Sequence, residues 1–531
     1  MKSPYNYMYF LALLFTSVWV QAQPIELYTQ FNGQYDFTAI GNTLLPVDNT
    51  DNEESSNCDI FTESSAELNL ASGQDVVAAY LYWAGVGEGD FEVQLNGLDI
   101  TPDRTFSETY GDQPYFGAFT DITDVVQATG NGTYTLSELD LTDIVFNYCF
   151  GGGGANTNFG GWSITIIYED STLPYNQVSI YDGLNRMHGL DSELNITLDN
   201  LNIVDSEGAK IGLLLWEGNS FVTGGFDSEF LYINGVNTID PPFNPYANIY
   251  NSTNSYTGAT DMWKVDLDLY SIEDLVNIGD DSIDIVVETG QDLIFVNNIN
   301  ITVRSELPDA TIVIDDVVGN DICGNRDLEV EYTVFNTNST APLPAGTPIS
   351  FYANASLLGT ASTLNNLPVN GSESGTTTQT IPGAIPIDFN LTAVVDDIGD
   401  GTGIVAETNE DNNVYTLPVS LTILDEFPTL YDLESCGLVG THIFDLYDAT
   451  VDVGVDMDVD FYYTLEDAED EVDEITDPTN FVNDTPPQTI YIRIRADECY
   501  YISSITVNTL PIPNAINPTP LEVCEIGRAH V

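Results

Sequence analysis

AYLYWAGVGEGDFEVQLNG, residues Ala79–Gly97, reads as an apolar strand, a turn rich in Gly, Glu and Asp, an alternating strand and a tight Asn-Gly turn. A similar phrase, GLLLWEGNSFVTGGFDSEFLYING, returns at Gly212–Gly235. The second copy keeps a tryptophan and the Asn-Gly turn but changes the polar residues between them. A repeated strand–turn–strand phrase indicates a duplicated β unit rather than a catalytic cassette.

The repeat extends beyond this phrase. Asp121–Leu136 parallels Asp268–Ile285, and Trp162–Tyr168 parallels Ile299–Val303 as a closing strand. Val, Ile, Tyr and Phe fill these segments, Gly, Asn and Asp separate them, and no long stretch shows the period of a helix. We therefore predict an all-β, multidomain chain in which a duplicated jelly-roll-like β-sandwich region is followed by Ig-like β-sandwich modules.

Turn-rich boundaries divide the chain of 531 residues into segments. At roughly 150 residues per domain, three or four domains are expected. The predicted segments are a signal peptide at 1–22, an N-terminal lead-in at 23–60, a duplicated β-sandwich region at 61–306 with halves at about 75–175 and 205–305, an Ig-like domain at 308–423, an Ig-like module at 424–512 and the start of a further module at 513–524.

The first residues have the pattern of an export signal. Lys2 is followed by the apolar run Tyr9–Val20, and a small-residue cleavage site ends at Ala22. The run is too short for a stop-transfer helix, and no other run is long enough to span a bilayer. We expect a secreted or cell-surface protein that is cleaved after Ala22 and is not inserted in a membrane.

The charge balance limits the partners. The chain has 10 Lys and Arg against 83 Asp and Glu, a net charge of −73. Such a surface repels nucleic acids and anionic membranes and attracts divalent cations. The acidic residues also keep an exported protein in solution, which is the simplest explanation for them.

The last seven residues, Glu525–Val531, match the translation of the start of a common short-read sequencing adapter. We interpret them as an artefact of that origin and expect the natural chain to continue past Cys524. The segment that leads to Cys436 recurs before Cys524, an offset of 88 residues, which predicts a tandem array of modules.

Six cysteines in an exported chain favour disulfides over metal thiolates. Cys58 and Cys149 fall in the first predicted sandwich and can pair. Cys436 and Cys499 bracket the module at 424–512 and are the second expected pair. Cys323 then has no identified partner.

The domain at 308–423 resembles the bacterial cell-adhesion-related domain known as CARDB. The residues that carry the resemblance are Pro308–Ala310, Val334–Ser339, Ala345-Gly346, Val395–Asp397 and Glu407–Asn413. The resemblance implies an Ig-like sandwich. The last of these phrases is the most specific, and its asparagines suit a tight turn because Asn tolerates left-handed backbone conformations.

The N-terminal block resembles the leading region of large secreted surface proteins of gliding bacteria. The resemblance rests on Leu81–Gly85, Phe159–Asp170 and Val178–Leu184. It implies an adhesin-like protein that is exported through outer-membrane type IX secretion machinery and carries tandem Ig-like repeats. The ligand, an extracellular glycan or protein, is not identified by it.

Calcium is the cofactor that the sequence favours most. Hard oxygen ligands in loops suit Ca²⁺, although the spacing differs from that of an EF-hand. The candidate ligands cluster around one Gly-rich hairpin and are Asp396, Asp397, Asp400, Glu407, Glu410 and Asp411. The alternative is an acidic loop surrounded by solvent and monovalent ions.

Enzymatic function is the alternative to adhesion. His188 and His442 lie in different predicted domains, so a Ser–His–Asp triad is not expected. A glycosidase needs only two carboxylates, and Glu217 is the best-placed candidate for one of them. Trp83 and Trp216 would stack on glycans if exposed, but we expect both in the core. The sequence therefore predicts a non-enzymatic adhesin with Ig-like spacers, and the alternative is a carbohydrate-active enzyme or glycan-binding module on an Ig-like stalk.

Overall fold

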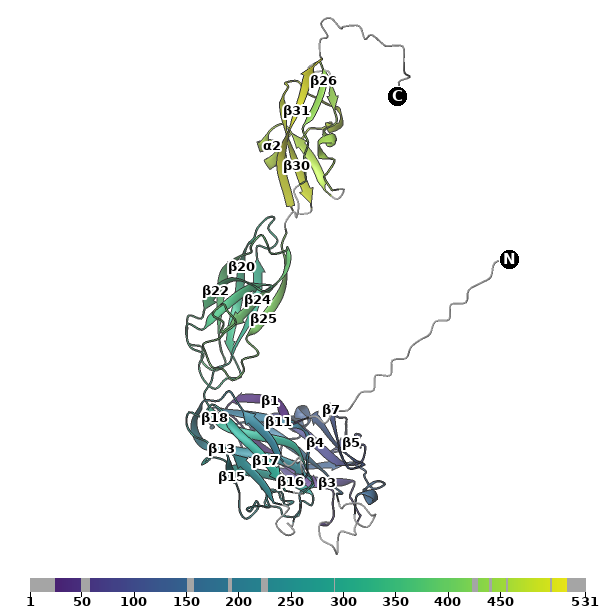
Figure 1. Ribbon diagram of the computed structural model, residues 1–531, viewed down its shortest axis with the longest axis vertical. Helices are drawn as coiled ribbons and strands as arrows, with labels where there is room; N and C mark the ends of the chain where they lie inside the picture. Colours follow the sequence, from purple (N-terminus) through teal and green to yellow (C-terminus); the bar gives the residue numbers. More distant parts are fainter. Residues whose placement is uncertain are drawn as a thin grey trace, which may run out of the picture.

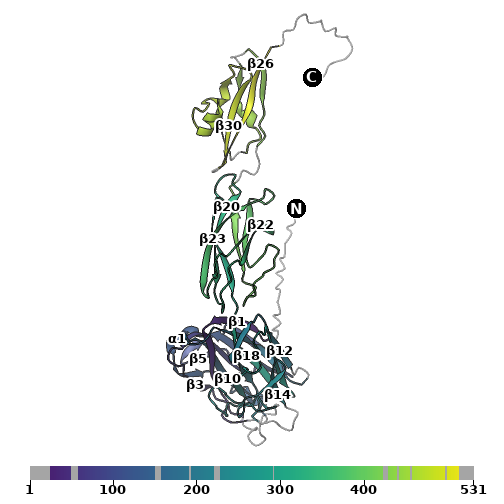
Figure 2. The same ribbon diagram turned by 90° about the vertical axis from the view of Figure 1, so that its left-hand side faces the viewer.

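A computed structural model describes residues 24–48, 58–149, 157–189, 193–220, 228–290, 292–422, 428–438, 442–454, 457–496 and 499–512. The predicted signal peptide, the predicted start of a further module at 513–524 and residues 525–531 lie outside this part. The described chain forms three all-β bodies arranged end to end (Figures 1 and 2). We name them the head (residues 24–305), the CARDB-like domain (308–422) and the terminal module (428–512).

The head holds strands β1 to β18 and the helix α1, Thr123–Thr129. Its central sheets have five strands each, in the orders β1-β11-β18-β13-β16 and β2-β10-β4-β8-β7. The central strands are β1 Glu26–Gly33, β2 Tyr35–Thr43, β4 Asp75–Val86, β7 Arg104–Tyr110, β8 Gln113–Asp121, β10 Gly160–Glu169, β11 Asn176–Met187, β13 Ile203–Trp216, β16 Val265–Ser271 and β18 Ile294–Ser305.

Two smaller sheets have four strands each, in the orders β3-β9-β5-β6 and β12-β17-β14-β15. Their strands are β3 Glu63–Leu68, β5 Val93–Leu95, β6 Leu98–Ile100, β9 Gly132–Ser137, β12 Glu193–Leu198, β14 Glu229–Ile233, β15 Val236–Thr238 and β17 Ile283–Thr289.

The strand orders repeat between the two halves of the head. The run β2-β10-β4-β8 corresponds to β11-β18-β13-β16, and the small sheet β3-β9-β5-β6 corresponds to β12-β17-β14-β15. The central sheets contact each other, as when the Tyr82 hydroxyl of β4 donates to Asp182 of β11 at 3.1 Å. Each small sheet covers the outer face of its own central sheet, so the head is a four-layer duplicated sandwich.

The structure differs from the predicted boundaries of these halves. Residues expected as a lead-in at 23–60 supply β1 and β2, which pair with β11 and β10. The second half begins with β11 at Asn176 rather than near residue 205. The alternation of β1 and β2 gives no indication of partners more than 100 residues away, so the sequence alone did not place them.

Trp83 and Trp216 are both fully buried, as expected. They nevertheless face different layers. Trp83 lies opposite Trp162 in the ladder, and the Trp162 indole donates to Ser64 of the small sheet. Trp216 instead faces the other central sheet, where a side chain on Gly161 would meet its ring. The two tryptophans therefore lie on equivalent strands but pack in different cores.

The CARDB-like domain is a sandwich of a three-stranded and a four-stranded sheet, in the orders β19-β20-β23 and β22-β21-β24-β25. Leu328, Val330 and Val334 are buried and alternate with exposed or half-buried residues along β20. The strands are β19 Ala310–Val318, β20 Asp327–Asn336, β21 Pro348–Ala353, β22 Ser356–Ser362, β23 Gly371–Thr380, β24 Asp388–Val395 and β25 Val414–Ser420.

The terminal module has a four-stranded sheet, β26-β31-β30-β28, and a small pair, β27-β29. The first strand, β26, runs parallel to the end of β31, and its Cys436 lies opposite Leu510. The elements are β26 Leu433–Gly437, β27 Ile443–Phe444, β28 Asp458–Tyr462, α2 Leu465–Asp470, β29 Phe481–Val482, β30 Gln488–Ala496 and β31 Cys499–Pro511. None of the helices in the described residues is long and apolar enough to cross a membrane.

Candidate functional site

The predicted calcium residues lie within the long connection between β24 and β25. Asp396 and Asp397 are each only 3% exposed. The Asp396 carboxylate accepts from the Ile404 and Val405 amides, and Asp397 accepts from the Gly399 and Gly401 amides at 2.8 and 2.9 Å. These carboxylates therefore replace the sheet partners that an irregular loop lacks.

The remaining predicted ligands, Asp400, Glu410 and Asp411, contact different parts of the structure. Asp400 is exposed and accepts from Thr402, while Glu410 accepts from the Glu407 amide at 3.0 Å. Asp411 is exposed and lines a crevice next to the head. In the part of the chain that the structure describes, no group of three or more His, Cys, Asp or Glu side chains is arranged to hold a metal ion. Calcium binding here stays a prediction.

Glu407 is the chemically unusual member of this loop. It is 1% exposed; its Oε2 accepts from the Ala310 amide at 2.9 Å, and its Oε1 has no hydrogen-bond partner. Burial raises the pKa of Glu407 to about 8, and the charges of Asp396, Glu410 and Asp309 act in the same direction. A protonated carboxyl group is therefore expected at neutral pH. Asp309, which the sequence analysis did not select, has its pKa raised to about 6 by burial.

The cysteines pair partly as predicted. Cys58 and Cys149 form a disulfide with a Cα–Cα distance of 5.7 Å. The predicted Cys436–Cys499 pair is wrong, because Cys499 is bonded to Cys323 and Cys436 is free and exposed. Cys436 lies opposite Leu510, eleven residues beyond Cys499 on β31, which is roughly 35 Å at about 3.3 Å per residue. The Cys323–Cys499 bond instead joins the CARDB-like domain to the terminal module.

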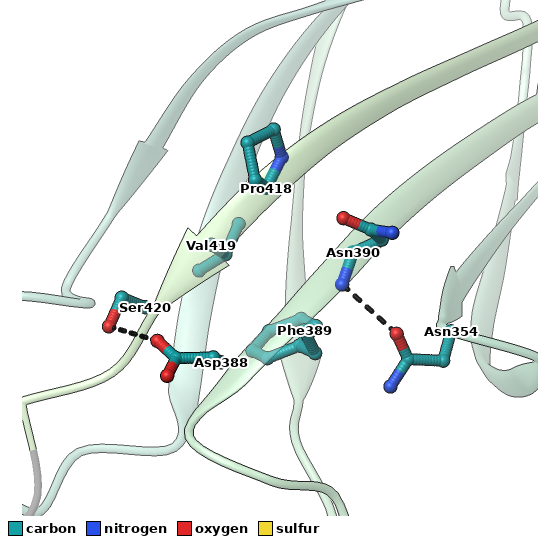
Figure 3. A pocket seen from close by; sticks show the side chains of 7 residues that line it. All are labelled: Asn354, Asp388, Phe389, Asn390, Pro418, Val419 and Ser420. Carbon is teal, nitrogen blue, oxygen red and sulfur yellow. Dashed lines mark hydrogen bonds between the residues drawn. The ribbon is translucent and has the colours of Figure 1, made fainter. Parts of the chain in front are cut away.

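Two pockets in the described chain have several polar residues in their lining. One of about 360 Å³ lies on the CARDB-like domain, where Ser420 donates to Asp388 and the Asn390 amide donates to Asn354 (Figure 3). Two hydrogen bonds therefore connect polar groups of its lining. A crevice of about 560 Å³ lies between the head and this domain, and its lining includes Tyr28, Tyr181, Asp199, Asn200, Asn338 and Asp411.

Buried and half-buried polar residues form a group at the end of the head's central sheet farthest from the CARDB-like domain. We name this group the apex cluster; its members are Glu217, Asn219, Glu229, Lys264, Asp266, Asp268 and Asp292. Strand pairing gives its position. Trp216, at the end of β13, pairs with Val265 at the start of β16 and with Phe295 near the start of β18. The other end of β18 leads into β19 of the CARDB-like domain.

Lys264 is the only cation within the apex cluster. The side chains of Lys264 and Glu217 are each 2% exposed, and Nζ lies 2.7 Å from Oε1. Both residues have positive φ, 63° and 77°, which costs roughly 1–3 kcal/mol for each non-glycine residue. Lys264 also donates to the Asn219 carbonyl, and the Asn219 amide donates to Asp292.

The acids of the apex cluster outnumber this one cation. Burial raises the pKa of Glu217 to about 8, with Lys264 opposing the shift. Burial also raises the pKa of Asp268 to about 7 and those of Glu229 and Asp266 well above their usual values. Glu229 Oε1 and Asp266 Oδ2 have no hydrogen-bond partner. At neutral pH the cluster is therefore rich in protonated carboxyl groups.

Glu217 was expected from the sequence only as a candidate glycosidase carboxylate, and its partners in the apex cluster were not predicted. Burial removes Glu217 from contact with any polymeric substrate. One signal was present in the sequence: the chain has three lysines, Lys2, Lys210 and Lys264, and only two of them follow the predicted signal peptide. Lys264 follows the apolar pair Met262-Trp263 in a chain with few lysines, and this context indicates a buried lysine with a specific partner.

Comparison with known proteins identifies one family. Residues 432–513 match the Flavobacterium inter-domain disulphide bond domain. That segment contains Cys499, whose partner lies in the preceding domain. No curated protein matches the chain.

Solved structures resemble parts of it. The CARDB domain of a Pyrococcus furiosus protein, crystallised with di-metal ions, is 27% identical over 23% of this chain and 97% of that domain, with a TM-score of 0.19. A Bacteroides uniformis β-glucuronidase is 10% identical over 46% of this chain and 26% of its own, with a TM-score of 0.15. The adhesin domain of Epf from Streptococcus pyogenes is 9% identical over 47% of this chain and 74% of its own, with a TM-score of 0.14.

Disulfide bonds persist in oxidising compartments outside the cytosol. The chain has two of them in its described part, and its terminal module matches a family described by such a bond. These observations indicate an extracellular, multidomain, all-β protein with a CARDB-like domain and a Flavobacterium-type disulphide module.

Proposed function

We propose that this protein is a non-enzymatic, adhesin-like surface protein that presents its head on a jointed stalk. The observation that carries the proposal is the pair of fixed joints between the three bodies. At the lower joint, Asn338 accepts from the Asn32 amide of β1 at 2.9 Å and donates to Gln30. At the upper joint, the Cys323–Cys499 disulfide joins the next two domains. Fixed joints favour a projecting rod over independent domains.

The apex of the head is the surface that such a rod projects. The CARDB-like domain follows β18 at one end of the head, and β16 and β18 begin at the opposite end, beside Trp216. A ligand of an adhesin would meet this end first. Extracellular glycans and proteins are the ligand classes we propose, and outer-membrane type IX machinery is the proposed export route.

The buried acids argue against the hydrolase alternative. The carboxyl groups of the apex cluster with raised pKa values, Glu217, Glu229, Asp266 and Asp268, are at most 2% exposed. A glycosidase needs a general acid that reaches the scissile bond of its substrate. These groups are instead suited to hold the apex together.

Localisation and attachment can be tested in one set of strains. Antibodies against the purified chain should label intact cells of the native organism, and a deletion strain should attach less well to polysaccharide- and protein-coated surfaces under flow. Unlabelled cells with normal attachment would refute the proposal. Hydrolysis of a panel of aryl glycosides by the purified chain would instead support the enzyme.

Calcium binding by the loop between β24 and β25 belongs to the same proposal. The loop contacts the start of the CARDB-like domain, since the Thr408 amide donates to the Pro308 carbonyl. Calcium bound in the loop would therefore also stabilise the lower joint. Chelation should then lower the melting temperature of the CARDB-like domain, and an equal melting temperature in calcium and in chelator would remove the ion from the proposal.

A further inference from the structure

The apex cluster contains an amine, a carboxamide and two acids in a continuous chain of contacts. Lys264 Nζ contacts Glu217 Oε1 at 2.7 Å and also the side-chain carbonyl of Asn219. The Asn219 nitrogen in turn contacts the Asp292 carboxylate. The carboxamide is therefore held between a nucleophilic nitrogen at one end and an acid at the other.

We propose that Lys264 and Asn219 become joined by a side-chain amide bond, an intramolecular isopeptide cross-link, with Glu217 and Asp292 moving the protons. The proposal is independent of the ligand and of the adhesive function. It assigns a covalent modification to residues that otherwise form an unusual buried ion pair.

The reaction balances without any further reagent. Glu217 takes a proton from Lys264 Nζ, and the nitrogen lone pair attacks Asn219 Cγ. As the Nζ–Cγ bond forms, Nζ passes its second proton to the carboxylates of the cluster. The Cγ–Nδ2 bond then breaks, and a proton held by the cluster passes through Asp292 to the departing nitrogen, which leaves as ammonia. No electrons are exchanged, and the protons of Glu217 and Asp292 then equilibrate through the cluster.

The protonation of the cluster suits both acids. Burial raises the pKa of Glu217 to about 8, so this carboxylate is a stronger base than an exposed one. Burial, followed by the charges of Asp292 and Asp266, raises the pKa of Glu229 well above its usual value. Glu229 therefore holds a proton at neutral pH that can reach the leaving group through Asp292.

The backbone holds the reactants in this arrangement. A Cβ atom on Gly218 would lie 1.9 Å from Asp266 Oδ2 and 2.7 Å from the Tyr250 carbonyl, so only glycine fits between Glu217 and Asn219. The Glu217 amide donates to the Lys264 carbonyl at 2.8 Å, which fixes the two chains against each other. Reactive groups held in contact gain the rate advantage of an intramolecular reaction.

An ordinary buried ion pair would explain the Lys264–Glu217 contact, but it leaves two features without a reason. Glu217 and Lys264 both adopt left-handed backbone conformations that direct their side chains at each other. The amide of Asn219 is also oriented from both ends, with its carbonyl towards the amine and its nitrogen towards Asp292. A cross-link accounts for both.

Mass spectrometry of the purified chain tests the proposal directly. The cross-linked chain is lighter by one ammonia, about 17 Da. An N-terminal glutamine such as Gln23 loses the same mass on cyclisation, so the loss must be located in a peptide that joins the segments around Asn219 and Lys264. After denaturation and reduction, the endoproteinase Lys-C should cleave after Lys210 but not after the acylated Lys264.

Two variants complete the test. The Asn219→Ala variant should show no loss of ammonia in the peptides around residues 219 and 264, and Lys-C should cleave it after Lys264. The Glu217→Gln variant keeps Asn219 but should form little cross-link. A wild-type chain with free Lys264 and intact Asn219 would overturn the proposal, and this measurement does not depend on whether the variants fold. A fully cross-linked Glu217→Gln chain would overturn the role of Glu217.

Discussion

Replacing Glu407 by glutamine should stabilise the CARDB-like domain at neutral and alkaline pH. Burial, followed by the charges of Asp396, Glu410 and Asp309, raises the pKa of Glu407 from 4.5 to about 8. The folded domain therefore holds a proton that the unfolded chain releases above pH 4.5. The stability that this proton contributes is fully present below pH 4.5 and is lost as the pH rises to about 8.

The size of the effect follows from this window. At about 1.4 kcal/mol for each pH unit, the wild-type domain loses up to about 5 kcal/mol between pH 4.5 and 8 through Glu407 alone. The neutral side chain of Glu407→Gln has no such dependence. The glutamine side chain also keeps an oxygen that can accept from the Ala310 amide, as Glu407 does at 2.9 Å. Its nitrogen takes the position of Glu407 Oε1, which has no hydrogen-bond partner.

Calorimetry in chelator across pH 5 to 8.5 is the suitable assay, with the matched variant Glu331→Gln, exposed on β20, as control. Tryptophan fluorescence cannot replace it, because Trp263 is the last of the five tryptophans and all the described ones lie in the head. Parallel pH profiles for wild type and Glu407→Gln would refute the reasoning. A variant that is stabilised in chelator but loses a calcium-dependent rise in melting temperature would make Glu407 a calcium ligand.

Five further substitutions test the packing of the head and the joint between the CARDB-like domain and the terminal module. Gly218→Ala should destabilise the head by about 1–3 kcal/mol, read by tryptophan fluorescence in urea, because its methyl group would overlap Asp266; an unchanged midpoint would contradict the close approach. Trp83→Ala and Trp216→Ala should each cost about 3–5 kcal/mol, and a small cost for either would place that ring outside the core. Cys323→Ser should lower the stability of the terminal module by about 2–5 kcal/mol and make it more sensitive to proteolysis, whereas Cys436→Ser should change neither.

The fold class and the duplication could be predicted because strand patterns are local. Leu328, Val330 and Val334 alternate within a few residues, and the repeated tryptophan phrase marks equivalent strands, β4 and β13. Pairing over long distances leaves no such mark. The strand β1 pairs with β11 about 150 residues later, and β26 pairs in parallel with β31, which separates Cys436 from Cys499.

The chemical sites were harder to predict for a different reason. A sequence with 83 acidic residues shows where carboxylates are common but not which of them are buried. Asp396 and Asp397 turned out to accept hydrogen bonds from their own loop, so their spacing reflects backbone geometry. Lys264 and Glu217 are 47 residues apart, and only the pairing of β13 with β16 brings them into contact.

The two halves of the head share a topology but close their apex in different ways. The first half has the Cys58–Cys149 disulfide and no lysine, with Ala84 after Trp83. The second half has no cysteine and has Glu217 after Trp216, in contact with Lys264. A cross-link from Asn219 to Lys264 would close a loop of 45 residues, against 91 for the disulfide. In the chain-entropy model, closing loops of 45 and 91 residues stabilises the folded state by about 4 and 5 kcal/mol, respectively. The residues that differ between the copies are therefore those that could give each half a covalent brace of similar strength.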